Sequence, residues 1–160
     1  MLVRLAPTAV LALGDLQYER GQLSNFRIAY DRSWGRLKAI TRPVPGNHEY
    51  LSAGGAGYFD YFGGAAGNPQ KGYYSFDLGA WHLIALNSQC SWVSGGCGPG
   101  SPQERWLKAD LAKHQNACTL AYWHEPRFLL RTARQQPGHR CVLARPLSGK
   151  CRHRVERERS

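Results

Sequence analysis

The sequence predicts an α/β fold with a mixed sheet, and three observations support this prediction. Short apolar runs of strand length alternate with helical segments along residues 1–128. Two of these runs are separated only by Gly79-Ala80, a spacing typical of an antiparallel β-hairpin. The length of 160 residues matches one domain that can bury a sizeable core.

The expected elements follow one another in the order β-α-β-loop-β-β-α-β. Strands are expected over 8–13, 42–45, 73–78, 81–87 and 119–123, and helices over 24–40 and from 102 to about 114. The first helix is expected to break near Ser33. The second begins at the capping box Ser101-Pro102-Gln103-Glu104, with proline at the first helical position. Residues 51–70 are glycine-rich, so we expect a long loop packed around the aromatic residues from Tyr58 to Phe62.

The first thirteen residues carry one arginine followed by apolar residues, a pattern that fits either a short signal peptide or a strand. The strand is favoured because Gly14-Asp15 follows without a cleavage site of small residues and a polar spacer. No acidic residue or histidine precedes Asp15. No apolar run approaches the roughly 18 residues needed to cross a bilayer, so no membrane partner is expected.

Residues 129–160 form a basic tail that carries a net charge of +7 out of the total of +10. The tail has no helical or strand period and little apolar surface to offset its chain entropy, so we expect it to be poorly ordered. One interpretation is a nucleic-acid-binding arm. The favoured interpretation is a frameshift, because codons for residues 149–158 read one nucleotide out of register can encode a hydrophobic strand that ends in Asn-Gly.

Polar residues suited to metal binding follow three of the expected strands. These residues are Gly14-Asp15 after the first strand, Gly46-Asn47-His48 after the second, and His124 at the end of the last. Ligand sites in α/β sheets lie at the carboxyl ends of the strands, so these side chains can converge. A carboxylate can bridge two cations, and an amide oxygen and a histidine nitrogen suit zinc, manganese or iron. The two glycines allow the backbone to turn sharply and to approach an ion closely.

As a set, these motifs resemble those of a known enzyme family. They read Gly14-Asp15-Leu16-Gln17-Tyr18, Gly46-Asn47-His48-Glu49 and Tyr122-Trp123-His124-Glu125-Pro126. The set is similar to that of the calcineurin-like metallophosphoesterases, and more closely to the purple acid phosphatase-like branch, whose second motif is Gly-Asp-x-x-Tyr. The likeness covers residues 8–128. It implies an αββα sandwich of two mixed sheets, with a two-metal site at one edge.

The resemblance also implies a role for each matching residue. Asp15 would bridge the two metals, and Tyr18 would bind the harder of them as a phenolate, although a tyrosine at this spacing can also simply pack. Asn47 and His124 would bind the second metal. His48 would be the catalytic residue beside the substrate phosphate, donating a hydrogen bond or a proton to the leaving group. Two ions of iron, manganese or zinc would activate a water for in-line attack on a phosphoester.

Two motifs of the family have no counterpart in this sequence. The family opens with an aspartate on an earlier strand, and it ends with Gly-His-x-His. Gly138-His139-Arg140-Cys141 is only a superficial likeness of that ending, so His139 is not assigned as a ligand. We therefore expect residues 1–128 to be an incomplete metallophosphoesterase domain that lacks the first strand and the last metal-binding segment. Each metal then loses at least one ligand, so this fragment is expected to hydrolyse slowly or not at all.

Two of the five cysteines, Cys90 and Cys97, bracket a loop rich in serine and glycine and lack the C-x-x-C spacing of a metal site. A local disulfide is the favoured interpretation, and two free thiols are the alternative. A disulfide indicates an oxidising compartment, so the parent enzyme is expected to be extracellular or periplasmic. Cys118 precedes a buried strand and is expected to be a packed thiol.

The favoured function is therefore a metal-dependent phosphoester hydrolase whose partner is a phosphoester substrate. The alternative is a basic-tailed nucleic-acid-binding protein without catalysis, which would bind phosphates in a salt-sensitive way. That alternative leaves Asp15, Asn47 and His124 unexplained, so nucleic acid is not the expected partner. A third hypothesis is a non-catalytic remnant that folds poorly, which the absence of cooperative unfolding would reveal.

Overall fold

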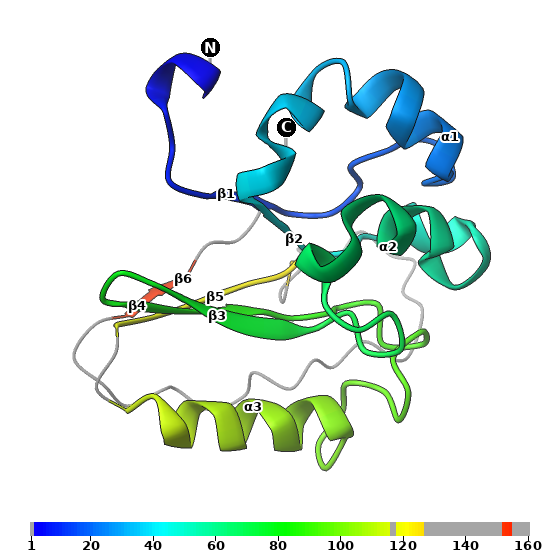
Figure 1. Cartoon of the computed structure of the whole chain (residues 1–160). Coiled ribbons are helices and arrows are strands. Elements are labelled where there is room, and N and C mark those ends of the chain that lie inside the picture. The colour runs from blue at the N-terminus through cyan, green and yellow to red at the C-terminus, as the bar shows by residue number, and fades with distance from the viewer. Residues whose placement is uncertain (1, 116–117, 127–151, 155–160) are drawn as a thin grey trace.

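The computed structural model describes residues 2–115, 118–126 and 152–154, which form two β-sheets flanked by helices (Figure 1). This arrangement confirms the predicted α/β class. The smaller sheet pairs β1 (Val10–Ala12) with β2 (Thr41–Pro43) in parallel. Among the described residues, we find no helix with the length and apolar character needed to span a bilayer.

The larger sheet has four strands in sequential order and is mixed, as predicted. Its strands are β3 (Tyr74–Leu78), β4 (Trp81–Ala85), β5 (Cys118–Tyr122) and β6 (Arg152–Arg154). β3 and β4 form the expected antiparallel hairpin, in which Leu78 lies opposite Trp81 across the Gly79-Ala80 turn. β5 runs parallel to both β4 and β6.

Strand β6 lies inside the basic tail and corrects one part of the expectation for that segment. Residues 152–154 pair with β5, so at least this piece of the tail contributes to the sheet. Backbone pairing at the open edge of β5 needs no hydrophobic period, which is why the sequence pattern missed it. Residues 127–151 and 155–160 lie outside the described residues. The predicted poor order of those residues and the predicted frameshift stay predictions.

The expected helix over 24–40 is present as three short pieces. α1 (Leu23–Asn25) continues into a π-helical turn (Phe26–Tyr30), and a 3-10 segment follows (Trp34–Ile40). The break lies at Ser33, as predicted, where the backbone leaves the helical region with φ −118° and ψ −86°. Three short 3-10 turns, Leu2–Leu5, Glu49–Leu51 and Ala53–Gly55, complete this part of the chain.

The expectation of a long loop over residues 51–70 was wrong, because α2 (Ala56–Phe62) and a 3-10 turn (Gly63–Ala66) lie within it. The predicted aromatic packing explains the helix. One helical turn brings Tyr58, Phe59, Tyr61 and Phe62 into a single buried cluster that also contains Phe26, Tyr30, Tyr50 and Ala66. Burying this much aromatic surface outweighs the low helix propensity of the neighbouring glycines.

Helix α3 (Pro102–Lys113) has the predicted bounds and the predicted N-terminal cap. The Ser101 hydroxyl accepts a hydrogen bond from the Glu104 backbone N–H at 3.1 Å. The Glu104 carboxylate reaches back to the backbone N–H of Gly100 at 2.6 Å. The first bond satisfies one of the N–H groups that a helix start leaves unpaired, and the second ties the preceding turn to the helix. Leu107, further along α3, packs in a cluster with Ile84 of β4.

The mixed sheet is covered by α3 on one face and by β1 and β2 on the other (Figure 1). Alternate residues of β5 make both contacts, with Ala121 packing on the α3 side and Tyr122 on the β1–β2 side. The Tyr122 hydroxyl donates to the carbonyl of Arg42 at 3.1 Å, which ties the two sheets together. This packing places the carboxyl ends of β1, β2 and β5 next to one another.

The predicted disulfide between Cys90 and Cys97 is present, with the two Cα atoms 5.0 Å apart. We expect its reduction to lower the free energy of unfolding by about 2–3 kcal/mol, because the bridge restricts the unfolded chain. Guanidinium unfolding with and without reductant measures this difference. A Cys90→Ser/Cys97→Ser double variant is the control and should not respond to reductant at this bridge. Peptide mapping that finds both thiols reduced in the purified protein would contradict the pairing.

Candidate functional site

The candidate site lies where β1, β2 and β5 end. Gly14 turns the chain after β1 with a positive φ of 81°. A larger residue would not fit here, because a Cβ on Gly14 would lie 2.7 Å from Nδ1 of His124. Asp15 follows with a φ of 53°, in the left-handed region that aspartate tolerates better than most residues. The turn therefore directs the Asp15 side chain toward the residues that follow β2 and β5.

The four predicted ligand residues converge in the structure. Oδ1 of Asp15 lies 3.4 Å from Nε2 of His124, and Oδ1 of Asn47 lies 3.2 Å from the same nitrogen. The Tyr18 hydroxyl donates a hydrogen bond to Oδ2 of Asp15 at 2.9 Å. Two ligand atoms on one metal lie roughly 3–3.5 Å apart when the metal–ligand bonds are about 2.0–2.2 Å. The predicted juxtaposition is confirmed, and its distances fit a shared cation.

His124 presents a lone pair to these oxygens. Its Nδ1 lies 2.8 Å from the carbonyl oxygen of Leu13, which can only accept, so Nδ1 carries a proton. In the neutral ring, Nε2 then faces two oxygen acceptors, from Asp15 and Asn47. Three lone-pair donors this close repel one another unless a proton or a metal ion lies between them. A metal-binding histidine typically donates its other N–H to a carbonyl or a carboxylate, as His124 does here.

The Asp15 carboxylate divides its two oxygens between two sets of partners. Oδ1 lies near Nε2 of His124 and accepts a hydrogen bond from the His48 backbone N–H, whereas Oδ2 accepts one from the Tyr18 hydroxyl. The Asp15 and His124 side chains are only 7% and 6% exposed, so their interaction is weakly screened by water. A carboxylate that presents one oxygen to each side has the geometry of a bridging ligand.

His48, the predicted catalytic residue, lies beside this group. Its ring is partly exposed, and its centroid lies 4.3 Å from that of the half-exposed Tyr18 ring. Nδ1 of His48 lies 2.6 Å from the carbonyl oxygen of Glu19 and therefore donates a hydrogen bond to it. The backbone N–H of His48 donates to Oδ1 of Asp15 at 3.2 Å. These two hydrogen bonds hold the ring and the backbone of His48 in place.

Glu49 supports the site, and the sequence analysis missed it. This side chain is completely buried and accepts four backbone hydrogen bonds. Its donors are the N–H groups of Asp15 (2.8 Å), Leu16 (2.8 Å), Gln17 (3.3 Å) and Gly46 (2.7 Å). One carboxylate therefore joins the turn after β1 to the turn after β2. The available signal was an acidic residue placed directly after Asn47-His48, between two otherwise apolar segments.

Gly46 must be glycine, because a Cβ at this position would lie 2.2 Å from Oδ1 of Asp15 and 2.6 Å from its backbone nitrogen. We expect Gly46→Ala to push Asp15 away from His124, to destabilise the protein by about 1–3 kcal/mol and to weaken metal binding. Gly64→Ala is the matched control, since a Cβ there meets nothing within 4 Å. Denaturant unfolding and metal titration of both variants provide the measurements. Equal behaviour of the two variants would contradict the tight contact.

A second group of metal-binding side chains, Asp77, His82 and His114, lies at the other end of the mixed sheet. The sequence analysis missed it as well. The only available signal was that Asp77 and His82 lie directly opposite each other in the predicted hairpin.

The comparisons with known proteins add no relative. No model of a known protein family matches the chain, and no curated protein sequence is significantly similar to it. The assignment of the site to a function therefore depends on its geometry and on the motifs themselves.

Proposed function

We propose that the residues at the ends of β1, β2 and β5 form the metal centre of a phosphoester hydrolase. One observation carries the proposal. Oδ1 of Asp15 and Oδ1 of Asn47 lie 3.4 Å and 3.2 Å from Nε2 of His124, although the three residues are far apart in the sequence. This is the arrangement that the calcineurin-like motifs imply, and two packed sheets with outer helices are compatible with part of the αββα sandwich of that family.

The residues divide into two sets of ligands for iron, manganese or zinc. Oδ1 of Asp15, Oδ1 of Asn47 and Nε2 of His124 would hold one ion. Oδ2 of Asp15 and the Tyr18 oxygen would hold the other once the tyrosine has lost its proton. Bound ions would supply an activated water and neutralise charge on the phosphoryl oxygens. Nitrogen and oxygen donors of this kind suit borderline and hard cations.

His48 would act on the leaving group. The hydrogen bond from its Nδ1 to Glu19 fixes the ring. In the doubly protonated ring, Nε2 would give its proton to the departing oxygen, which leaves a neutral imidazole with its proton on Nδ1. Contact with the Tyr18 ring keeps His48 beside the metal ligands. Because the described part of the chain supplies two groups to the second ligand set, we propose that its ion is held weakly and that hydrolysis is slow.

The disulfide supports an exported protein, since such bridges persist in extracellular and periplasmic compartments. Nucleic-acid binding by the basic tail is the less favoured function. Nucleic-acid binding gives no reason for Asp15, Asn47 and His124 to lie together. It also does not explain why the buried Glu49 carboxylate holds the turns after β1 and β2 in place.

Hydrolysis of p-nitrophenyl phosphate after loading with Mn²⁺, Zn²⁺ or Fe³⁺ tests the proposal. We expect a metal-dependent rate above that of the metal ion alone. His48→Gln should lower this rate at least about 100-fold, the usual contribution of a general acid, and should leave the metal affinity within about twofold. Failure of every loaded form to hydrolyse the ester, or an unchanged rate in His48→Gln, would contradict the assignment.

A further inference from the structure

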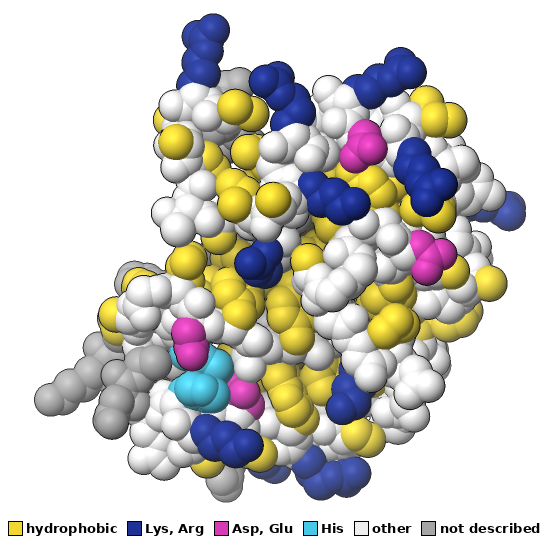
Figure 2. All heavy atoms as spheres, viewed as in Figure 1, with side chains coloured by type: hydrophobic (Ala, Val, Ile, Leu, Met, Phe, Trp, Pro, Cys, Tyr) yellow, Lys and Arg dark blue, Asp and Glu magenta, His cyan; other side chains and the backbone are white. Residues whose placement is uncertain are grey.

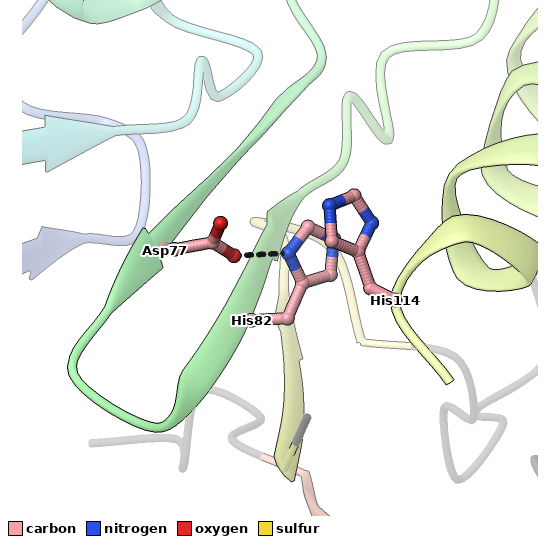
Figure 3. A group of neighbouring side chains, drawn as sticks. All are labelled: Asp77, His82 and His114. Carbon is pink, nitrogen blue, oxygen red and sulfur yellow. Dashed lines mark hydrogen bonds and ion pairs between the residues drawn. The ribbon is translucent and has the colours of Figure 1, made fainter. Parts of the chain in front are cut away.

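We propose that Asp77, His82 and His114 form a second metal site, which binds Zn²⁺ or a similar divalent cation and links the β3–β4 hairpin to the end of α3. This inference is independent of the proposed phosphoesterase activity. One ligand atom from each of the three residues lies within 4.8 Å of the other two. Figure 3 shows the two imidazole rings lying face to face, with Asp77 beside one nitrogen of His82.

The backbone brings the three residues together from separate elements. Asp77 on β3 lies directly opposite His82 on β4, so their side chains share a face of the hairpin. His114 is the residue that caps the C-terminus of α3. Since His82 pairs with Thr119 at the start of β5, the group lies at the opposite end of this sheet from His124. The two candidate sites are therefore separate.

His82 has the orienting partners typical of a metal ligand. Its Nε2 lies 2.6 Å from Oδ2 of Asp110, and the other oxygen of Asp110 accepts a hydrogen bond from Ser75 at 2.8 Å. Metal-bound histidines commonly donate their second N–H to a carboxylate that is itself hydrogen-bonded. This arrangement leaves Nδ1 of His82 pointing at Oδ1 of Asp77, 2.7 Å away.

His114 is oriented in a comparable way. Its Nδ1 lies 2.8 Å from the backbone carbonyl oxygen of Asp110 and therefore donates to it, which leaves Nε2 with the lone pair. The ring lies on that of His82 with a centroid separation of 3.7 Å and an interplanar angle of 11°. Nε2 of His114 and Nδ1 of His82 are thus the nitrogens that would bind a cation, and Nδ1 of His82 would give up its hydrogen bond to Asp77 to do so.

Without a metal, a proton occupies the position between His82 and Asp77. Burial lowers the pKa of His82, but the hydrogen bonds to Asp110 and Asp77 and their charges together raise it above its ordinary value. A divalent cation would replace this proton. Parallel rings cannot direct both in-plane lone pairs at one ion, so metal binding requires His114 to tilt. His82 is only 1% exposed and fixed, whereas Asp77 (64% exposed) and His114 (31% exposed) can adjust.

The site also has an entry path for a cation. A surface pocket of about 640 Å³ opens beside the group, and both Asp77 and His114 line it. Figure 2 shows histidine and acidic side chains gathered at the surface over the end of α3 and the hairpin. Two imidazole nitrogens, one carboxylate oxygen and a water from this pocket would complete the four-coordinate set that Zn²⁺ prefers.

Calorimetric titration with Zn²⁺ tests the site in an Asp15→Asn background, which removes the first candidate centre. We expect about one equivalent of Zn²⁺ to bind and to raise the melting temperature. Adding His114→Ala should weaken this binding at least about tenfold and abolish the thermal shift, because one ligand is lost. Adding Gln115→Ala instead should change neither, since this exposed neighbour lines the pocket but offers no ligand of the proposed set.

Two results would overturn the proposal. One is an Asp15→Asn protein that binds no Zn²⁺, and the other is unchanged Zn²⁺ affinity after His114→Ala. His114 is partly exposed at a helix end, so the variant should remain folded, and circular dichroism checks this directly. The comparison with and without His114 does not depend on whether the first centre binds metal, so failure of the proposed phosphoesterase function leaves this test intact.

Discussion

Replacement of Glu49 by alanine should cost at least about 4 kcal/mol of the free energy of unfolding. The variant leaves four backbone N–H groups without their acceptor, and each unpaired buried donor costs about 1–3 kcal/mol. Domains of ordinary stability unfold with about 5–15 kcal/mol, so Glu49→Ala is expected to be mostly unfolded or poorly expressed. Denaturant unfolding gives the value where enough protein folds.

Glu49→Gln keeps the same prediction testable in a folded protein. A glutamine retains one acceptor oxygen, so it can satisfy either the Asp15 and Gly46 amides or the Leu16 and Gln17 amides, but not both pairs. We expect one of these two pairs of backbone amides to exchange faster with solvent in a hydrogen-exchange experiment. Glu19→Gln is the matched control, because Glu19 is exposed and closely follows Asp15, Leu16 and Gln17 in the segment after β1. Equal protection in both variants would show that Glu49 does not hold the two turns together.

Asp15→Asn should reduce metal affinity at the first candidate centre by more than about 100-fold. The substitution removes the only carboxylate among the proposed ligands, and it presents an amide NH₂ group to one side of the centre. Loss of a bridging charge next to a second cation costs several kcal/mol at low solvent exposure, and each 1.4 kcal/mol is a tenfold change. Titration with Mn²⁺ or Zn²⁺ measures the loss.

The Asp15→Asn protein should remain folded, because the amide can still accept the hydrogen bond from the His48 backbone N–H. Asp60→Asn provides the matched control, since Asp60 is an exposed residue on α2, away from the turns that carry the ligands. If both variants bound metal as tightly as the unmodified protein, Asp15 would not be a ligand.

Local patterns in the sequence were sufficient to predict most of the elements. The Gly79-Ala80 turn predicted the hairpin because a two-residue connection permits little else. The Ser101 cap and the following proline fixed the start of α3 for the same local reason. The missed helix α2 depends instead on tertiary burial of Tyr58 and its neighbours, which no local propensity records.

The site was predictable only in part. Asp15 and Asn47 could be placed together because the parallel strands β1 and β2 share a carboxyl edge. His124 follows β5 of the other sheet, so its place beside them was predictable only because the three motifs occur as a set. The support from Glu49 depends on backbone N–H groups of another segment, which a sequence does not reveal. The pairing of His114 with His82 depends on how α3 docks on the sheet, so this second group could be found only in the folded structure.

Anomalous diffraction from crystals grown with Mn²⁺ tests the central claim most directly, because it locates a bound ion without reference to activity. We predict a peak within bonding distance, about 2.0–2.2 Å, of the Asp15, Asn47 and His124 ligand atoms, and a weaker peak between Asp15 and Tyr18. A map with no peak at Asp15, in crystals that contain saturating Mn²⁺, would contradict the metal centre and the phosphoesterase function built on it.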